Sequence, residues 1–285
     1  MVTEQAFQRS LFGVSALLFV ASAVVTIVWC ASMSAMGEMP MPGGWTMSMA
    51  WMRMPGQTWP GAAASFLGMW VVMMVAMMLP SLVPMLWRYS QAVDRTGETR
   101  LSRLSALVGV GYFWVWTVFG LATFLLGVVL ATVAMQLPAL ARAVPMAASV
   151  VVLIAGSLQF TKWKTHHLAC CRGEIPGRDP RRDSGRDAMA LYPDLYPASH
   201  PTLPAKAGTA WRHGVRLGLH CIHSSAGLTA ILLVMGVMNL RAMAVVTAAI
   251  TVERLAPAGE HVRRAIGIVV VAVGLLLIAQ AAGFG

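Results

Sequence analysis

The segment WRHGVRLGLHCIHSSAGLTAILLVMGVMNL, residues 211–240, joins a polar first half to an apolar second half. Its first half carries ionisable or metal-capable side chains at His213, Arg216, His220, Cys221 and His223. At 3.6 residues per turn, the three His and the Arg share one stripe of a helix, with the Cys beside it. A polar group in hydrocarbon costs free energy unless it is paired. We therefore expect a membrane-spanning helix whose stripe faces protein, water or a ligand.

The composition around this segment is that of a membrane protein. Of the 285 residues, 58% are hydrophobic and 11% are charged, whereas soluble domains carry about 25% charged residues. The mean hydropathy is +0.69. Runs of roughly 20 apolar residues cross a bilayer, and candidate spans lie at about 11–33, 62–87, 105–134, 146–163, 215–238, 240–256 and 265–283. The expected fold is all-α, a polytopic transmembrane helix bundle of six to seven spans that forms a single domain over residues 1–285.

The net charge of +10 is explained by orientation in the membrane. With a cytoplasmic N-terminus, only Arg53, Arg142 and Arg241 of the 21 Lys and Arg residues lie on the outer side, which leaves 18 on the inner side. This distribution is the positive-inside pattern of plasma-membrane proteins. We therefore expect a cytoplasmic N-terminus and the lipid bilayer as a partner, and no nucleic-acid partner.

An outer loop rich in Met and Trp is expected over residues 34–60. Residues 33–60 hold eight Met and three Trp. Thioether sulfur is a soft ligand that suits Cu(I), so Met47 and Met49 in this loop are candidate ligands. The alternative is an amphipathic segment in the headgroup region, in which Met fills packing gaps.

The next predicted span continues the methionine pattern. Met69, Met73 and Met77 recur at intervals of four residues, with Met74 and Met78 beside them. One face of this helix is therefore a ladder of thioethers, and Met73 and Met77 are candidate ligands on it. A plain helix–helix interface explains the same spacing.

A second group of His and Cys follows the span expected at 146–163. His167 and Cys171 are four residues apart, and His166 and Cys170 repeat that spacing. The charge pattern places this group and the 211–240 stripe at the same end of consecutive spans. We expect a shared metal site there, with ligands drawn from His167, Cys170, Cys171, His220, Cys221 and His223. Such a nitrogen and sulfur set suits zinc, Cu(I) or another transition metal, whereas the alternative has His at lipid phosphates and Cys buried as small apolar residues.

Residues 173–210 form a cytoplasmic loop rich in Pro and Arg, without apolar periodicity. It is long for a connection, so we expect partial disorder or a partner-docking segment.

Several of these stretches resemble a bacterial family of predicted metal-binding integral membrane proteins, a domain of unknown function. The matching stretches are GGWTMSMAWMRMPGQTW (43–59), MMVAMMLPS (73–81), AGSLQF (155–160) with the Cys-Arg at 171–172, and 214–240 with GVMNL, followed by Glu253. The resemblance implies Cys171 and Cys221 as thiolate ligands. The family pattern has Cys at the position of His167 and Cys-x-Gly-Cys-Cys where this chain reads Cys-Ile-His-Ser-Ser (221–225), so His167 and His223 are candidate replacement ligands.

The leading hypothesis is a metal-handling protein of the bacterial inner (plasma) membrane, for Cu(I) acquisition, delivery or transport. Copper is the favoured metal, zinc or haem are possible, and a periplasmic metalloprotein is a possible partner. One alternative is a non-catalytic membrane subunit of a larger complex, and another is a redox enzyme that holds haem or a metal at the His stripe. Enzymatic activity stays open, although the chain carries no phosphate-binding loop and no hydrolase elbow.

Overall fold

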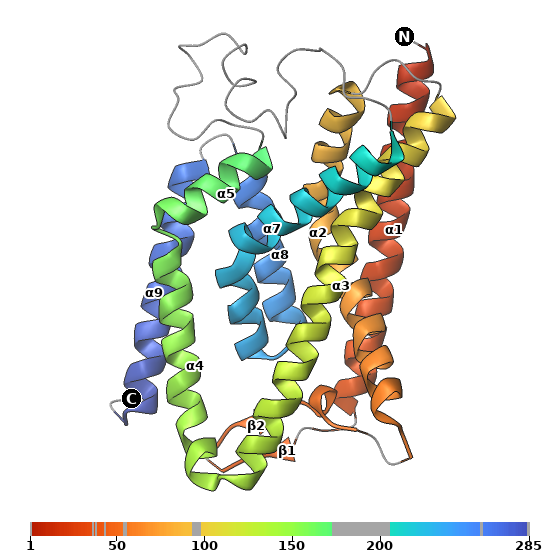
Figure 1. The fold of residues 1–285 in the computed structure, drawn as a ribbon. Helices are drawn as coiled ribbons and strands as arrows, with labels where there is room; N and C mark the ends of the chain where they lie inside the picture. Colours follow the sequence, from red (N-terminus) through yellow and green to blue (C-terminus); the bar gives the residue numbers. More distant parts are fainter. Residues whose placement is uncertain are drawn as a thin grey trace.

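The computed structural model describes residues 2–35, 37, 39–42, 44–53, 56–92, 98–172, 206–256 and 259–283, and all statements below concern this part of the chain. Most of the loop expected at 173–210 lies outside it. The described helices are α1 (Val2–Ala35), α2 (Trp59–Ala92), α3 (Glu98–Gln136), α4 (Pro138–Leu158), α5 (Lys162–Arg172), α7 (Ala207–Met235), α8 (Leu240–Leu255) and α9 (Gly259–Ala281). They form one bundle, with the N-terminus at one end and the C-terminus at the other (Figure 1).

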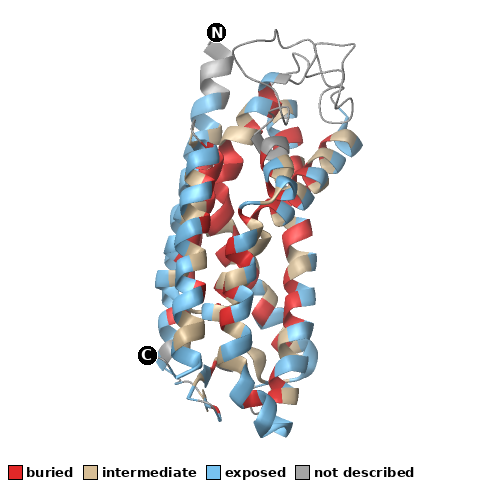
Figure 2. Ribbon diagram, turned by 90° about the vertical axis from the view of Figure 1, so that its left-hand side faces the viewer, coloured by how far each residue is buried: buried red, intermediate tan, exposed pale blue. Residues whose placement is uncertain are grey.

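The expected all-α bundle is confirmed. Six helices are long and apolar enough to cross a membrane, and they are α1, α2, α3, α4, α7 and α9. Their outward sides carry exposed apolar side chains, and Leu17, Leu126 and Leu276 are each more than half exposed. Figure 2 shows the complementary pattern, with buried residues on the inward sides of the helices. The helices therefore present the apolar outer surface that a membrane-embedded bundle requires.

The seventh candidate span, at 240–256, forms a helix that is too short for this role. Helix α8 has 16 residues, so it is about 24 Å long, whereas the hydrocarbon core measures about 30 Å. It forms a hairpin with α7, and the turn of this hairpin lies inside the bundle (Figure 1). Gly236 makes the turn with a φ of +99°, and the Asn239 side chain caps α8 by accepting the backbone N–H of Ala242.

The span expected at 146–163 has different ends and stops before the His and Cys residues. Helix α4 begins at Pro138, a favoured first residue of a helix, and ends at Leu158. A turn at residues 159–161 then redirects the chain, and α5 runs at an angle to α4 (Figure 1). The Thr161 hydroxyl accepts the backbone N–H of Lys164 and so caps the start of α5.

Helices α3 and α7 approach each other closely enough for their backbones to touch. A side chain at Gly214 would overlap the backbone carbonyl of Val108, and a Cβ at Gly111 would lie 2.8 Å from the carbonyl oxygen of Trp211. Only glycine permits this contact of the two backbones. The contact fixes the register of α3 against α7 and brings Tyr112 next to Cys221.

The loop before α2 is folded against the end of the bundle opposite α5. It contains two short antiparallel strands, β1 (Met39–Pro40) and β2 (Thr46–Met47), and a 3₁₀ turn at Met49–Trp51. The Trp45 indole N–H donates to the carbonyl oxygen of Ala141 at 2.9 Å, which attaches this loop to α4.

Candidate functional site

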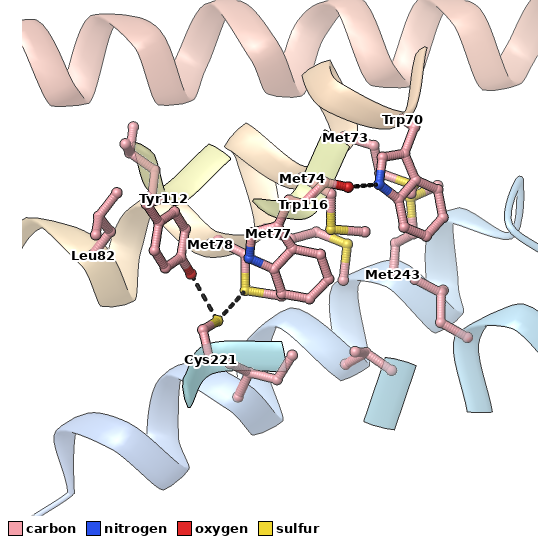
Figure 3. Close-up of a cluster of buried hydrophobic side chains, with 14 of the residues drawn as sticks. Trp70, Met73, Met74, Met77, Met78, Leu82, Tyr112, Trp116, Cys221 and Met243 are labelled. Carbon is pink, nitrogen blue, oxygen red and sulfur yellow. Dashed lines mark hydrogen bonds between the residues drawn. The ribbon is translucent and has the colours of Figure 1, made fainter. Parts of the chain in front are cut away.

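The methionine ladder of α2 is buried in the centre of the bundle. Its five members are each at most 4% exposed, and they are Met69, Met73, Met74, Met77 and Met78. Figure 3 shows Met73, Met74, Met77 and Met78 of α2 with Met243 of α8, and all five ladder methionines belong to the same buried cluster as Met243. Helix α2 is the most buried of the six spans, with 61% of its apolar window buried, so the ladder faces protein and not lipid.

Cys221 lies at one end of this ladder and is fully buried. Its Sγ atom is 3.9 Å from the Sδ atom of Met78 and 2.8 Å from the hydroxyl of Tyr112 (Figure 3). The Nη2 atom of Arg254 lies 2.9 Å from the same sulfur. Four helices, α2, α3, α7 and α8, thus each contribute one side chain to a site that has no exposed member.

The guanidinium of Arg254 is held in place by several acceptors. Nη1 donates to the Ser81 hydroxyl at 3.1 Å, and Nη2 donates to the Ser224 hydroxyl at 3.1 Å and to the Cys221 carbonyl oxygen at 3.4 Å. The thiolate is the form of cysteine that binds metals, and charge-assisted hydrogen bonds favour an anionic partner. The site therefore places a positive charge of fixed position beside a soft sulfur atom.

The spacing of the two sulfur atoms fits a shared ion. With a metal–sulfur bond of about 2.3 Å, two sulfurs on one ion lie between about 3.8 Å in tetrahedral geometry and about 4.6 Å in linear geometry. The separation of 3.9 Å between Met78 and Cys221 falls in this range. A weak sulfur hydrogen bond explains the same contact without a metal, so the distance shows that the pair fits an ion and not that it holds one.

Two tryptophans complete the wall of this cluster. The Trp70 indole N–H donates to the backbone carbonyl oxygen of Trp116 at 3.0 Å (Figure 3). The Trp116 indole N–H is buried and lies toward the Tyr112 hydroxyl, which also contacts Cys221.

A second cluster lies where α5 crosses α7, and it consists of histidines. Nδ1 of His167 is 3.1 Å from Nδ1 of His220, and the rings of His167 and His223 stack at 4.9 Å between centroids. Nδ1 of His223 donates to the carbonyl oxygen of Leu219 at 2.7 Å, so Nε2 is the ring nitrogen that this contact leaves available. Burial, and then the neighbouring His223, His220 and His166, lower the pKa of His167 from 6.5 to about 4. His167 is therefore neutral at physiological pH, as a metal-binding imidazole must be.

Helix α5 is fixed against α8 by a buried ion pair. Lys164 Nζ lies 2.9 Å from the Glu253 carboxylate, and both side chains are at most 4% exposed. The Lys164 ammonium also donates to the side chain of Gln159, and Arg263 donates to the Gln159 carbonyl oxygen. Burial lowers the pKa of Lys164, and the attraction of Glu253 opposes this shift. This pair positions α5 so that His167 reaches α7.

The predicted ligands thus fall into separate groups. The structure brings His167, His220 and His223 together, and it places Cys221 on another side of α7, with Met73 and Met77 in the adjoining core. The side chains of Cys170, Cys171 and Met49 lie outside the described residues. Met47 is buried in a small cluster with Met41 and alanines of α3 and α4. His213, the first histidine of the predicted stripe, does not join the other histidines and stacks on Tyr89 of α2. Among the side chains that the structure describes, no group of three or more His, Cys, Asp or Glu is placed to hold a metal ion.

Sequence reasoning missed three contributors to the buried site. The charge pattern places Arg254 among the inner positive charges, beside Glu253 as an ion-pair candidate, and Tyr112 lies in a span with no other sign of chemistry. Met78 was noted as part of the ladder and was not singled out as a ligand. The sequence signal that could have identified Arg254 is an arginine at the end of an apolar run. An ionisable group at membrane depth is costly and therefore indicates a functional site.

Comparisons with curated proteins and with solved structures find no match. The sequence model of one family, PpoB2, which is described as a copper chaperone, matches residues 67–277. The matched range contains the methionine ladder, the Cys221 site and the histidine cluster, and it begins after the loop of residues 34–60. It supports the expected link to copper, and it does not test the resemblance to the predicted metal-binding membrane family. Because the match covers well over half of the 285 residues, the chain belongs to the PpoB2 copper chaperone family.

Proposed function

We propose that the protein binds Cu(I) inside the membrane at Met78 and Cys221 and transfers it between the two membrane faces. The observation that carries this proposal is the pair of sulfur atoms 3.9 Å apart in a fully buried site at the end of a methionine ladder. The thioethers of α2 give an ion successive ligands along the helix. The family description supports copper as the metal.

The chemistry of the ligands favours Cu(I) over other metals. Thioether and thiolate sulfur select Cu(I), whereas Mg²⁺ and Ca²⁺ require oxygen ligands. The buried Met78–Cys221 pair offers sulfur, and a carboxylate ligand for a hard ion is missing from the contacts described for it. The sulfur ligands of the ladder therefore favour a soft metal ion such as Cu(I) over a hard one.

The charge balance of the site also favours a monovalent ion. The guanidinium of Arg254 and a Cys221 thiolate already sum to zero, so Cu(I) adds one positive charge to the buried site and a divalent ion adds two. The cost of buried charge, and repulsion from the guanidinium 2.9 Å from the same sulfur, therefore disfavour zinc and Cu(II) more than Cu(I).

The histidine cluster is the proposed exchange point at the cytoplasmic face. His220 directly precedes Cys221 on α7 but points to a different side of the helix, so an ion that leaves the thiolate has to pass around α7 to reach imidazole. His167 of α5 lies within 3.1 Å of His220. Cys170 and Cys171, the thiols that the sequence predicts on α5, would complete a site from which a partner removes the ion.

The test is a Cu(I) titration of the purified protein in mild detergent, under reductant, against a chromophoric Cu(I) chelator. Met78→Leu and Cys221→Ala are each expected to weaken Cu(I) binding at the buried site by at least about tenfold, since each removes one ligand of a pair. Met135→Leu, at an exposed methionine of α3, is the matched control and is expected to bind like the wild type. If the variant that combines Met78→Leu with Cys221→Ala is folded and keeps the wild-type Cu(I) affinity and stoichiometry, the proposal is wrong.

A further inference from the structure

A groove opens at the end of the bundle opposite α5, next to the first methionine of the ladder. Its volume is about 210 Å³, and thioethers of Met33, Met52, Met69 and Met238 line it together with Trp29 and Phe66. These methionines come from four separate parts of the chain, namely α1, the loop before α2, α2 itself and the turn between α7 and α8. Helix periodicity on a single element does not account for such a convergence.

A cysteine adjoins one wall of this groove. Cys30 of α1 is 2% exposed, and its Sγ atom lies 4.0 Å from the Sδ atom of Met238. This separation again lies in the range of about 3.8–4.6 Å that two sulfurs on one ion require. The two residues are 208 positions apart in the sequence, and the α7–α8 turn that stops inside the bundle brings them together.

We propose that this groove is a second Cu(I) site, in which the Cys30–Met238 pair binds the ion and Met33, Met52 and Met69 surround it. Met69 belongs both to the groove and to the ladder, with Met73 one helical turn further along α2. An ion in the groove therefore has a continuous series of sulfur ligands toward Cys221. The groove is the loading site for the transfer that is proposed above, and the inference rests on that proposed function.

The first experiment counts the Cu(I) ions that the full-length protein binds in detergent, with Cu(I) alone as the probe. The groove variant combines Cys30→Ala with Met238→Leu, both of which keep an apolar side chain of similar shape and so limit the effect on folding. It is expected to lose one equivalent of Cu(I) and to keep the other. The buried-site variant, Met78→Leu with Cys221→Ala, is expected to lose the equivalent that the groove variant retains, and Met135→Leu is expected to keep both.

The two proposals fail in different ways in this experiment. Wild-type stoichiometry in the groove variant, with loss of copper in the buried-site variant, overturns the groove site and leaves the proposed function intact. Wild-type binding in both variants overturns both. Binding that is lost only in the groove variant supports the groove site and overturns the site at Cys221.

A second measurement keeps the inference testable if the groove variant does not fold. The wild-type protein is alkylated with N-ethylmaleimide with and without Cu(I) or Ag(I), and mass spectrometry quantifies the modification of Cys30. Bound ion is expected to slow the alkylation of Cys30 several-fold in the wild type and in Met135→Leu. Equal alkylation rates with and without the ion, at concentrations that saturate binding, overturn the site.

Discussion

The Sγ atom of Cys221 lies 2.9 Å from Nη2 of Arg254, and neither side chain is more than 6% exposed. A buried guanidinium is costly unless it is paired or hydrogen-bonded. Here its partners are two serine hydroxyls and the backbone and sulfur of one cysteine. The guanidinium therefore lies against the sulfur atom that we propose as a Cu(I) ligand.

The first prediction concerns this contact. Arg254→Gln removes the guanidinium that contacts the Cys221 sulfur, Ser81 and Ser224, and glutamine cannot make the same set of hydrogen bonds. Hydrogen bonds to charged groups contribute about 1.5–3 kcal/mol, which corresponds to a loss of roughly ten- to a hundredfold in Cu(I) affinity at the buried site. Chelator competition measures this loss.

The control for that variant is Arg264→Gln, which removes an exposed arginine that pairs with Glu260 one turn earlier on α9. It is expected to leave Cu(I) affinity unchanged. An Arg254→Gln protein with wild-type Cu(I) affinity would show that the guanidinium serves only the fold.

The second prediction tests the α3–α7 contact. Gly214→Ala places a methyl group against the backbone carbonyl of Val108 and forces the helices apart. Overpacking of this kind costs about 1–3 kcal/mol, so thermal stability in detergent is expected to fall. Cu(I) affinity is expected to fall as well, because the Tyr112–Cys221 contact depends on the same register.

Gly208→Ala is the matched control on the same helix, since nothing lies within 4 Å of a Cβ at that position. It is expected to be neutral or slightly stabilising, as alanine is the better helix former. If both alanine variants melt at the wild-type temperature, the backbone contact between α3 and α7 is not as close as described.

The third prediction concerns the buried ion pair that holds α5. Lys164→Met leaves the Glu253 carboxylate buried without its ammonium partner, and breaking a buried pair costs about 3–5 kcal/mol. The double variant Lys164→Met with Glu253→Leu is expected to recover much of this loss, because it removes both charges. Thermal melts of the wild type, Lys164→Met, Glu253→Leu and the double variant give the coupling, and additive losses in the double variant would refute the pairing.

The fourth prediction is a pH dependence at the α5–α7 crossing. Folding lowers the pKa of His167 from 6.5 to about 4. Between these two pH values the unfolded chain therefore binds a proton at His167 that the folded protein does not. The contribution of His167 to stability is therefore complete above pH 6.5 and declines as pH falls toward 4. Melting temperatures across this range are expected to drop less steeply in His167→Gln than in the wild type, and parallel curves would exclude the histidine as the cause.

The sequence predicts much of the fold, because apolar run length and the placement of positive charge are direct consequences of the bilayer. The break between α4 and α5 was missed because Gln159-Phe160-Thr161 contains neither Gly nor Pro. The short α7–α8 hairpin was readable in part, since Gly236 and Asn239 are typical residues for a turn and a helix cap.

The grouping of the ligands was harder to predict. His220 and Cys221 are adjacent, so their side chains diverge by about 100° around the helix. The direction of each depends on which helices surround α7, and only the packing against α3 assigns Cys221 to the core and His220 to α5. In contrast, the spacing of the α2 methionines alone predicts that they share one face of the helix, without knowledge of the tertiary structure.

The glycine contact between α3 and α7 makes one side of the Cys221 environment more rigid than the other. On the α3 side two backbones touch directly, and no side chain between them can rotate to make space. On the α2 side the neighbour is Met78, whose unbranched thioether changes rotamer at little cost. If Cu(I) binds at Cys221 as proposed, we expect a rotamer change of Met78, and not a separation of α3 from α7, to make room for the ion.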